Sequence, residues 1–312
     1  MNRDAMPAST IQDDRLGIVR AHDYDRYISA LLAPREWRMD LMLLYAFDAE
    51  MARIPLTVTE PMLGEIRLQW WRDALSPLLT VAGRAPPTSA ARTGHPLADG
   101  LLDLARRHAL PAGLIHGLID ARSADLADAP LRDDSELRSY IAKTDAAVLA
   151  LSVHLLTSAP PENIDTLIGA VGRAVGLLRL ARHISAGDRR AEMLVPLTVW
   201  PLDDRHTHAG DETANARFES ARTHAILQLT KLATEEVERS RRELSRLPLA
   251  LRPAFLPMAL VPRYATHLQK IAANPALAGH DINPLSRLWT LWRARRRSIF
   301  LARQIPSEPT DA

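Results

Sequence analysis

Apolar residues recur at a spacing near 3.6 along almost the whole chain, and proline or glycine separates most of these stretches from the next. This spacing is typical of amphipathic helices, and no segment alternates apolar and polar residues as a strand would. The pattern predicts helices over residues 23–33, 35–53, 61–75, 97–109, 112–127, 134–157, 162–186, 212–246, 249–273 and 284–303. The sequence therefore predicts an all-α fold.

Two consecutive helices indicate how the interior is built. From Met39 to Phe47 the chain is apolar on nearly every side, which is typical of a central helix surrounded by others. The next helix is preceded by the pattern Thr57-x-x-Glu60, which predicts a capping box. Its apolar residues Leu63, Ile66 and Trp70 lie on one face, and Trp70 and Trp71 are expected to pack in the core and at its rim.

The chain is predicted to form one domain. Residues 82–96 are rich in Pro, Ser, Thr and Gly, which indicates a connecting loop. We expect a flexible N-terminal segment over residues 1–20, a helical domain over 21–303 and a tail over 304–312. A hydrophobic content of 47% and a charged content of 24% are ordinary for a globular domain and suffice for a core.

Composition excludes several classes of protein. The chain has no cysteine, so neither disulfides nor thiolate metal sites are expected. The formal net charge is only +2, and this gives no support for nucleic-acid binding. No stretch of about 18 apolar residues predicts a membrane span, and residues 1–20 lack the apolar region of a secretory signal. We therefore expect a cytoplasmic protein, with a peripheral position on the inner membrane as the alternative.

Some polar pairs resemble metal ligands, but a structural role is preferred for each. Asp99 and Asp103 share a helix face, and we expect them to lie at an exposed helix start. His206 and His208 lie in an irregular segment and are expected to be solvated. No metal site is predicted.

Three motifs carry a resemblance to a known family. Leu31–Pro34 reads LLAP, Leu44–Phe47 reads LYAF, and Arg67–Leu75 reads RLQWWRDAL. In order and spacing they resemble the squalene/phytoene synthase family, and the resemblance extends from about Tyr24 to Arg263. It implies an isoprenoid-synthase-like helical bundle with a central cavity.

The resemblance also implies a first metal-binding motif, which this chain lacks. Active members of the family place an Asp-rich motif directly after YAF, where it holds Mg²⁺ against a diphosphate. The matching positions here are Ala52, Arg53 and Leu56, which offer no carboxylate. Asp48 and Glu50 lie nearby, but residues two apart point to different sides of a helix, so we expect them to be solvated or capping carboxylates.

The second metal-binding motif of the family is altered in the same way. There a later helix carries paired acidic residues, whereas this chain has Leu180, His183 and the turn Gly187-Asp188-Arg189-Arg190. One carboxylate remains. Without both motifs, the charge neutralisation that ionises an allylic diphosphate is missing.

At both motifs the chain is most similar to one branch of the family, the assembly factors of respiratory complex I. The segments that carry this similarity are AFDAEMA at residues 46–52, the stretch from Val58 to Trp70, and the second-half residues Arg182, Gly187, Arg189, Arg190 and Pro196. The resemblance implies a non-catalytic protein with complex I subunits or assembly intermediates as partners and an isoprenoid or lipid as a candidate ligand.

Two other functions remain open at this point. One is an Mg²⁺-dependent head-to-head prenyltransferase of the squalene or phytoene synthase type. The other is a lipid or quinone carrier that keeps the cavity and needs no partner protein. No cofactor is expected unless the synthase alternative holds.

The resemblance and the residue pattern together nominate two sites. Arg182, Asp188, Arg189 and Arg190 surround one turn and form a candidate anion or partner site, with a solvated turn as the alternative. The candidate cavity lining is Leu43, Phe47, Met51 and Leu178. A further acidic segment contains Asp120 and Asp125, for which pairing with Arg122 or Arg138 is at least as well supported as a functional role.

The last predicted helix is both aromatic and basic. Its candidate membrane contacts are Trp289, Trp292, Arg293 and Arg296. Such a helix can rest on an anionic membrane surface, where each basic residue contributes about 1 kcal/mol. Packing as the last helix of the bundle, with a solvated arginine face, is the alternative.

Overall fold

The computed structural model of the chain describes residues 17–81, 92–127, 129–201, 205, 212–274, 277 and 281–296. Every regular element among these residues is a helix, and none is a strand. The prediction of an all-α fold is confirmed.

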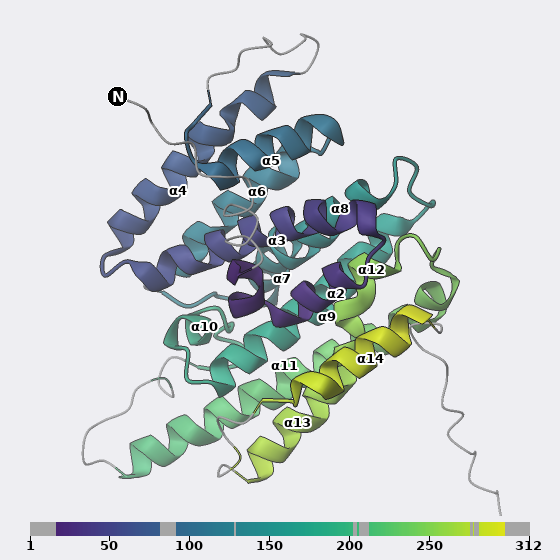
Figure 1. The fold of residues 1–312 in the computed structure, drawn as a ribbon. Helices are drawn as coiled ribbons and strands as arrows, with labels where there is room; N and C mark the ends of the chain where they lie inside the picture. The colour runs from purple at the N-terminus through teal and green to yellow at the C-terminus, as the bar shows by residue number, and fades with distance from the viewer. Residues whose placement is uncertain are drawn as a thin grey trace, which may run out of the picture.

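The helices follow one another along the chain in the order shown in Figure 1. Those of the first half are α2 (Tyr24–Leu31), η1 (Arg35–Trp37), α3 (Arg38–Arg53), η2 (Ile54–Thr57), α4 (Pro61–Leu75), η3 (Ser76–Val81), α5 (Pro96–Arg107), α6 (Ala112–Ala121), η4 (Arg122–Leu126), α7 (Asp134–Lys143) and α8 (Asp145–Leu156). Those of the second half are α9 (Ile164–Ser185), α10 (Arg189–Met193), α11 (Glu212–Arg246), α12 (Arg252–Phe255), η6 (Leu256–Leu260), α13 (Val261–Ala273) and α14 (Pro284–Arg296).

Helix α3 lies at the centre of the N-terminal half. Each residue from Leu41 to Phe47 is at most 4% exposed, and α3 packs against α2, α5 and α8. A helix that is apolar on all sides must be covered on all sides, because each exposed large side chain would forgo about 1.5–3 kcal/mol of burial. The expectation of a central helix is confirmed.

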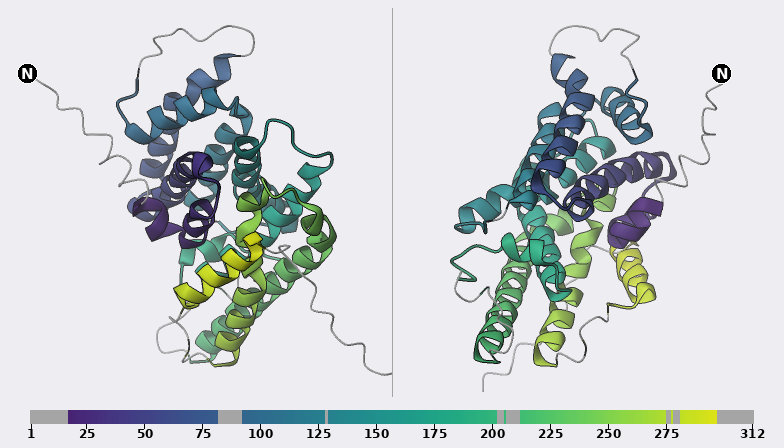
Figure 2. Two further views of the ribbon diagram at one scale, coloured as in Figure 1. Left: turned by 45° about the vertical axis from the view of Figure 1, so that its right-hand side comes forward. Right: turned by 90° about the vertical axis from the view of Figure 1, so that its left-hand side faces the viewer.

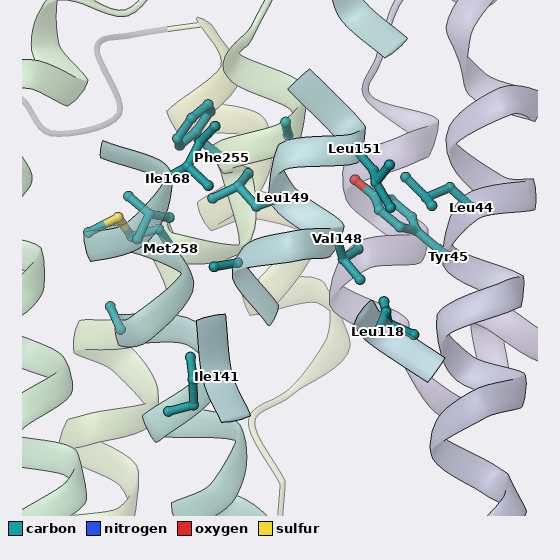
Figure 3. Close-up of a cluster of buried hydrophobic side chains, with 14 of the residues drawn as sticks. Leu44, Tyr45, Leu118, Ile141, Val148, Leu149, Leu151, Ile168, Phe255 and Met258 are labelled. Carbon is teal, nitrogen blue, oxygen red and sulfur yellow. The ribbon is translucent and has the colours of Figure 1, made fainter. Parts of the chain in front are cut away.

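Helix α9 is the corresponding centre of the C-terminal half, where it packs against α8, α11 and α13. Its glycines permit a close approach to α8: a Cβ at Gly172 would lie 2.4 Å from the Cβ of Ala146. The space between α3, α8, α9 and η6 is filled by side chains that include Tyr45, Val148 and Met258 (Figure 3). The cavity left there measures only about 20 Å³.

Two predicted helices each form more than one α-helix in the structure. Residues 134–157 form α7 and α8, because Thr144 leaves the helical region with φ −110° and ψ −91°. Its hydroxyl donates to the carbonyl of Tyr140 at 2.8 Å. Residues 249–273 form α12, η6 and α13, each of which has a proline in its first turn. A proline there is tolerated, whereas inside a continuous helix it would remove a hydrogen bond.

Two smaller expectations are wrong. The predicted capping box is absent, since the Thr57 hydroxyl donates to Ile54 O at 3.0 Å and accepts from Arg67 instead. Thr57 therefore closes η2 and does not open α4. Val19, assigned to the N-terminal segment, is fully buried and belongs to the helical domain.

The arrangement places two groups of helices at opposite ends of the molecule. Helices α4, α5 and α6 lie together at one end, whereas α13 and α14 lie at the other, and both further views agree (Figures 1 and 2). None of the helices in the described part of the chain is long and apolar enough to cross a membrane.

Candidate functional site

Asp48 of α3 lies at the centre of a buried group of charges. Arg26 Nη1 donates to its Oδ2 at 2.5 Å, and Arg122 Nη2 donates to its Oδ1 at 2.8 Å. All three residues are at most 8% exposed. The expectation of a solvated or capping Asp48 is wrong, because the helix that carries it is covered on all sides.

Asp145, the first residue of α8, is the second carboxylate of the group. Arg179 of α9 binds it through two bonds, Nε to Oδ1 at 3.1 Å and Nη2 to Oδ2 at 2.8 Å, and Arg26 Nη2 lies 3.6 Å from Oδ1. Burial alone would raise the pKa of Asp145, but the charges of Arg179 and Arg26 lower it to about 2. Gly176 makes this approach of α9 possible, since a Cβ there would lie 2.9 Å from Asp145 Oδ2.

A third carboxylate, Asp125 of η4, completes the group. Arg122 Nη1 lies 3.2 Å from Asp125 Oδ2, and the Tyr140 hydroxyl donates to Oδ1 at 2.6 Å. Burial, followed by the charge of Asp125, raises the pKa of Tyr140. The structural pairing expected between Asp125 and Arg122 is confirmed, whereas Asp120 binds Arg72 at 2.7 Å.

We name this group the inner network. It contains three arginines and three aspartates, so its formal charges balance: Arg26, Arg122, Arg179, Asp48, Asp125 and Asp145. Although burial disfavours the charged form of each guanidinium, the surrounding carboxylates raise the pKa of Arg26 and of Arg122 above the usual value. The network joins α2, α3, η4, α8 and α9, with the Tyr140 hydroxyl linking α7 to it.

A second group of charges surrounds Asp25 of α2. Arg182 and Arg287 each lie 3.3 Å from one of its oxygens, and the Tyr264 hydroxyl donates to it at 2.9 Å. Arg182 also lies over the Tyr264 ring, 3.9 Å from its centroid. Burial raises the pKa of Asp25 against the effect of the two arginines.

The larger cavity opens beside these two groups. It has a volume of about 750 Å³ and lies between α2, α9, α13 and α14. Its polar wall includes Arg179, Arg182 and Arg287, and its apolar wall includes Leu178 and Leu268. Most of the charge on the polar wall is already paired within the protein.

Three of the four residues predicted to line a cavity do not do so. Leu178 lines the larger cavity, but Leu43, Phe47 and Met51 line neither of the two cavities described here. Each of the three is at most 4% exposed and belongs to the packed core. The reason is that neighbouring helices cover these positions of α3, so of its core residues Tyr45 alone borders the small cavity described here.

The four residues proposed as one anion site have different partners and do not converge on one point. Asp188 caps α10, accepting from Arg190 N at 3.0 Å, and contacts His183 Nδ1 at 2.9 Å. Arg190 donates to Val58 O at 3.3 Å and Arg189 is exposed, whereas Arg182 belongs to the Asp25 group. Gly187, with φ +83°, ends α9 and changes the direction of the chain, which separates Arg182 from the two later arginines.

The remaining positions of the first altered motif lie at the end of α3 and just beyond it. Ala52 is half-buried, Arg53 pairs with Glu50 at 3.2 Å, and Leu56 is 59% exposed. They provide no oxygen ligand. Asp99 accepts from Thr93 N at 2.7 Å at the start of α5, as expected of an acid at a helix start, and His206 and His208 lie outside the described residues.

The predicted membrane contacts lie on the outer side of α14. Trp289 is 58% exposed, Trp292 is half-buried, and their rings stack at 5.0 Å. Arg293 and Arg296 are exposed, and Arg296 lies 4.5 Å from the centroid of the Trp292 ring. On the inner side, Arg287, Leu291 and Ala294 are buried, so α14 is also the last packed helix of the bundle.

Solved structures of similar fold define the class of this protein. Squalene synthase HpnC from Alicyclobacillus acidocaldarius matches with a TM-score of 0.63 and 17% identity, covering 85% of this chain and 95% of that one. A dehydrosqualene synthase matches with a TM-score of 0.63 and 14% identity, covering 92% of this chain and 96% of that one. The fold is that of the squalene and phytoene synthases.

The sequence places the chain within that class. The family model for squalene/phytoene synthase matches residues 19–293, so the chain belongs to the squalene/phytoene synthase family. A protein of Rattus norvegicus named NADH dehydrogenase (ubiquinone) complex I, assembly factor 6, is 25% identical over 284 residues, covering 90% of this chain and 81% of its own. The protein of that name from Homo sapiens is 23% identical over 256 residues, covering 82% of this chain and 73% of its own.

A magnesium ion, which the family resemblance implies, does not fit the residues present. Magnesium requires oxygen ligands, supplied mostly by carboxylates and phosphates. Both oxygens of Asp48 and both oxygens of Asp145 are bound by arginines. In the part of the chain that the structure describes, no group of three or more His, Asp or Glu side chains could hold a metal ion.

Neither periodicity nor a motif in the sequence nominates Arg26, Asp145, Arg179 or Arg287 as site residues. One signal was available: each is a charged residue at a position where its helix is otherwise buried. Charged residues are almost never fully buried unless they are paired. Such positions on strongly apolar helices therefore indicate a buried ion pair, although the partner is not evident from spacing.

Replacing Asp145 with Asn tests the inner network. The change leaves Arg179 and Arg26 without a carboxylate, and we expect the free energy of unfolding to fall by about 3–5 kcal/mol at pH 7. The pKa of Asp145 is lowered to about 2 in the folded protein. Its contribution to the free energy of unfolding is therefore fully present above the pKa that Asp145 has in the unfolded chain, and it is lost as the pH falls through the folded pKa. The difference between wild type and variant should thus shrink by about 2 kcal/mol as pH falls from about 4 towards 2.

Urea denaturation over a pH series measures both effects. The control is Glu238→Gln, since Glu238 is exposed and pairs with Arg241 on the surface of α11. Surface pairs contribute only about 0–1 kcal/mol. The inner network would be contradicted if Asp145→Asn lowered the free energy of unfolding by no more than the control does. It would also be contradicted if the loss for Asp145→Asn stayed the same as the pH falls towards 2.

Proposed function

We propose that this chain is an assembly factor of respiratory complex I that acts by association and not by prenyl transfer. The observation that carries the proposal is the inner network, in which Asp48 and Asp145 are each neutralised by arginine. The names of its relatives support the same role, since they are complex I assembly factors of Rattus norvegicus, Bos taurus and Homo sapiens.

The synthase alternative requires a different charge distribution. Ionising a prenyl diphosphate needs cations that stabilise the departing diphosphate, and the family supplies them as Mg²⁺ held by carboxylates. Here the guanidinium groups of Arg26 and Arg122 are compensated by Asp48 and Asp125. A charge-balanced network in which every carboxylate oxygen is already bound leaves no carboxylate for the metal.

The carrier alternative requires room for a long apolar chain. Between Tyr45, Val148, Phe255 and Met258 the cavity measures about 20 Å³, roughly the space that holds one water molecule. The larger cavity is open but has a charged wall. We therefore prefer the assembly role, and binding of an isoprenoid or lipid to the larger cavity stays a prediction, which native mass spectrometry of the purified protein would test.

A strain that lacks the gene tests the assembly role. We expect it to lose assembled NADH dehydrogenase on native gels, while its carotenoids and hopanoids remain normal, and we expect the wild-type gene to restore the complex. Normal complex I together with missing isoprenoid products would reject the proposal and favour the synthase.

We further propose that the protein works at a membrane surface through the outer side of α14. Leu285 is 74% exposed and Trp289 is 58% exposed, and Arg293 and Arg296 lie beside them. Apolar and aromatic side chains flanked by arginines are typical of a helix that lies in the interface of an anionic bilayer. The buried side of the same helix holds it on the bundle.

Sedimentation with vesicles tests whether the outer side of α14 contacts a membrane. Wild-type protein should bind vesicles that contain anionic lipid and should bind less as salt is raised, because the screening length falls below about 8 Å. Trp289→Glu should reduce the bound fraction, whereas the control Leu249→Glu, at a residue 62% exposed elsewhere, should not. Removing α14 is a poor test, because it also removes the buried Arg287. Equal binding by all three proteins would contradict the membrane contact.

A further inference from the structure

The exposed face of α4 and its two flanking 3-10 helices is the largest collection of uncovered apolar side chains in the described residues. Six of the thirteen exposed large hydrophobic residues lie there: Leu56, Met62, Leu63, Ile66, Trp70 and Leu79. The four on α4 share one side of the helix, opposite the buried side formed by Gly64, Leu68, Trp71 and Leu75. We name the surface formed by all six residues the α4 face. Exposed patches of this kind mark interaction sites on soluble proteins.

The face is rigid. A Cβ at Gly64 would lie 2.5 Å from Leu126, which shows how closely η4 supports the buried side of α4. Arg72 ties α4 to α6 through Asp120 at 2.7 Å. Trp70 makes edge contacts with Trp71 at 5.1 Å and with His95 at 5.3 Å, so its half-exposed ring is held in place. A rigid aromatic side chain loses little conformational entropy on binding and is typical of an interface hot spot.

The charges around the α4 face are predominantly acidic. Glu60 and Asp73 are exposed and form no ion pair with any residue that the structure describes. Of the nearby arginines, Arg72 is shared by Asp120 and Glu65, while Arg67 donates to the neutral Thr57 hydroxyl and forms no ion pair with the described residues. The four carboxylates of Glu60, Glu65, Asp73 and Asp120 outnumber these two guanidinium groups. Uncompensated carboxylates beside an apolar surface favour a cationic partner and oppose an anionic membrane.

The surface charge at the opposite end of the molecule has the opposite sign. Among the described residues, the charges on the outer side of α14 are basic: Arg293 and Arg296, both exposed in its last turn. Helices α4 and α14 lie at opposite ends in all three views (Figures 1 and 2). One end thus suits an anionic surface, and the other suits a basic and apolar segment of a protein.

We propose that the α4 face binds a basic amphipathic helix of a partner protein. An amphipathic helix matches a straight apolar stripe about three turns long, and lysine or arginine beside its own stripe would pair with Glu60 and Asp73. This inference deepens the proposed function and rests on it for the identity of the partner, but the docking chemistry is tested with the purified chain alone.

The probe is a designed peptide of about 18 residues, five helical turns, with leucines along one stripe and lysines beside them. A second peptide has the same leucines with glutamates in place of the lysines. We expect the full-length protein to bind the lysine peptide and not the glutamate peptide in a fluorescence anisotropy titration. We expect Ile66→Glu to weaken binding of the lysine peptide about 30-fold or more, as for a hot-spot residue.

Leu249→Glu is the matched control, because Leu249 is 62% exposed and Ile66 is 59% exposed. Both variants should keep the wild-type melting temperature, since neither position is buried. Equal binding of the two peptides, or equal binding by wild type and Ile66→Glu, would overturn the proposal. Two other results would also overturn it. If sedimentation velocity showed a wild-type dimer that Ile66→Glu dissociates, the occupant would be a second copy of this chain. If vesicle binding depended on Ile66, the occupant would be a lipid surface.

The same variants test whether the α4 face is needed for complex I assembly in the cell. In the strain that lacks the gene, Ile66→Glu should fail to restore complex I and Leu249→Glu should restore it. Full restoration by Ile66→Glu, in a strain whose deletion abolishes complex I, would reject the α4 face and leave the assembly role intact. Normal complex I in the deletion strain would reject the assembly role, while the peptide titration would still decide the docking chemistry.

Discussion

The pairing of Asp48 with Arg26 and Arg122 is the interaction on which the rest of the structure depends. These three side chains come from α3, α2 and η4, and each is almost fully buried. A buried charge without a partner costs several kcal/mol, so the three helices must hold their relative positions for the network to be satisfied. Asp145 and Arg179 extend the same constraint to α8 and α9.

The network also determines what chemistry the interior can perform. Asp48 and Asp145 are bound through both oxygens by arginines, so neither carboxylate is free to hold a metal ion. The nearby carboxylates raise the pKa of Arg26 and of Arg122, so both guanidinium groups stay charged. The carboxylates therefore remain paired with arginine at any pH at which they are themselves ionised. The narrow space between Tyr45 and Met258 agrees with this view, since it leaves no path for a prenyl chain. This is why the proposed function is assigned to the surfaces, where α4 and α14 differ in charge.

Much of the fold could be predicted from local sequence, and most of the site could not. Helix α3 was evident because a long apolar segment must be central. The division at Thr144 was not evident, because it depends on a turn that presents Asp145 to Arg179. The partners of Asp48 lie 22 and 74 residues away in the chain, so spacing on one helix could not reveal them. Periodicity likewise placed Leu63, Ile66 and Trp70 on one face, but only the packed structure tells which face is covered.

We propose that arginine has taken the place of metal chemistry in the interior of this chain. The most direct test of this proposal is the release of diphosphate from farnesyl or geranylgeranyl diphosphate by purified protein with Mg²⁺. The account predicts no release above background, for wild type and for Asp48→Asn alike. Magnesium-dependent release at about 1 s⁻¹, the lower end of typical turnover, or even at a hundredth of that rate, would contradict it, the more so if Asp48→Asn abolished that release.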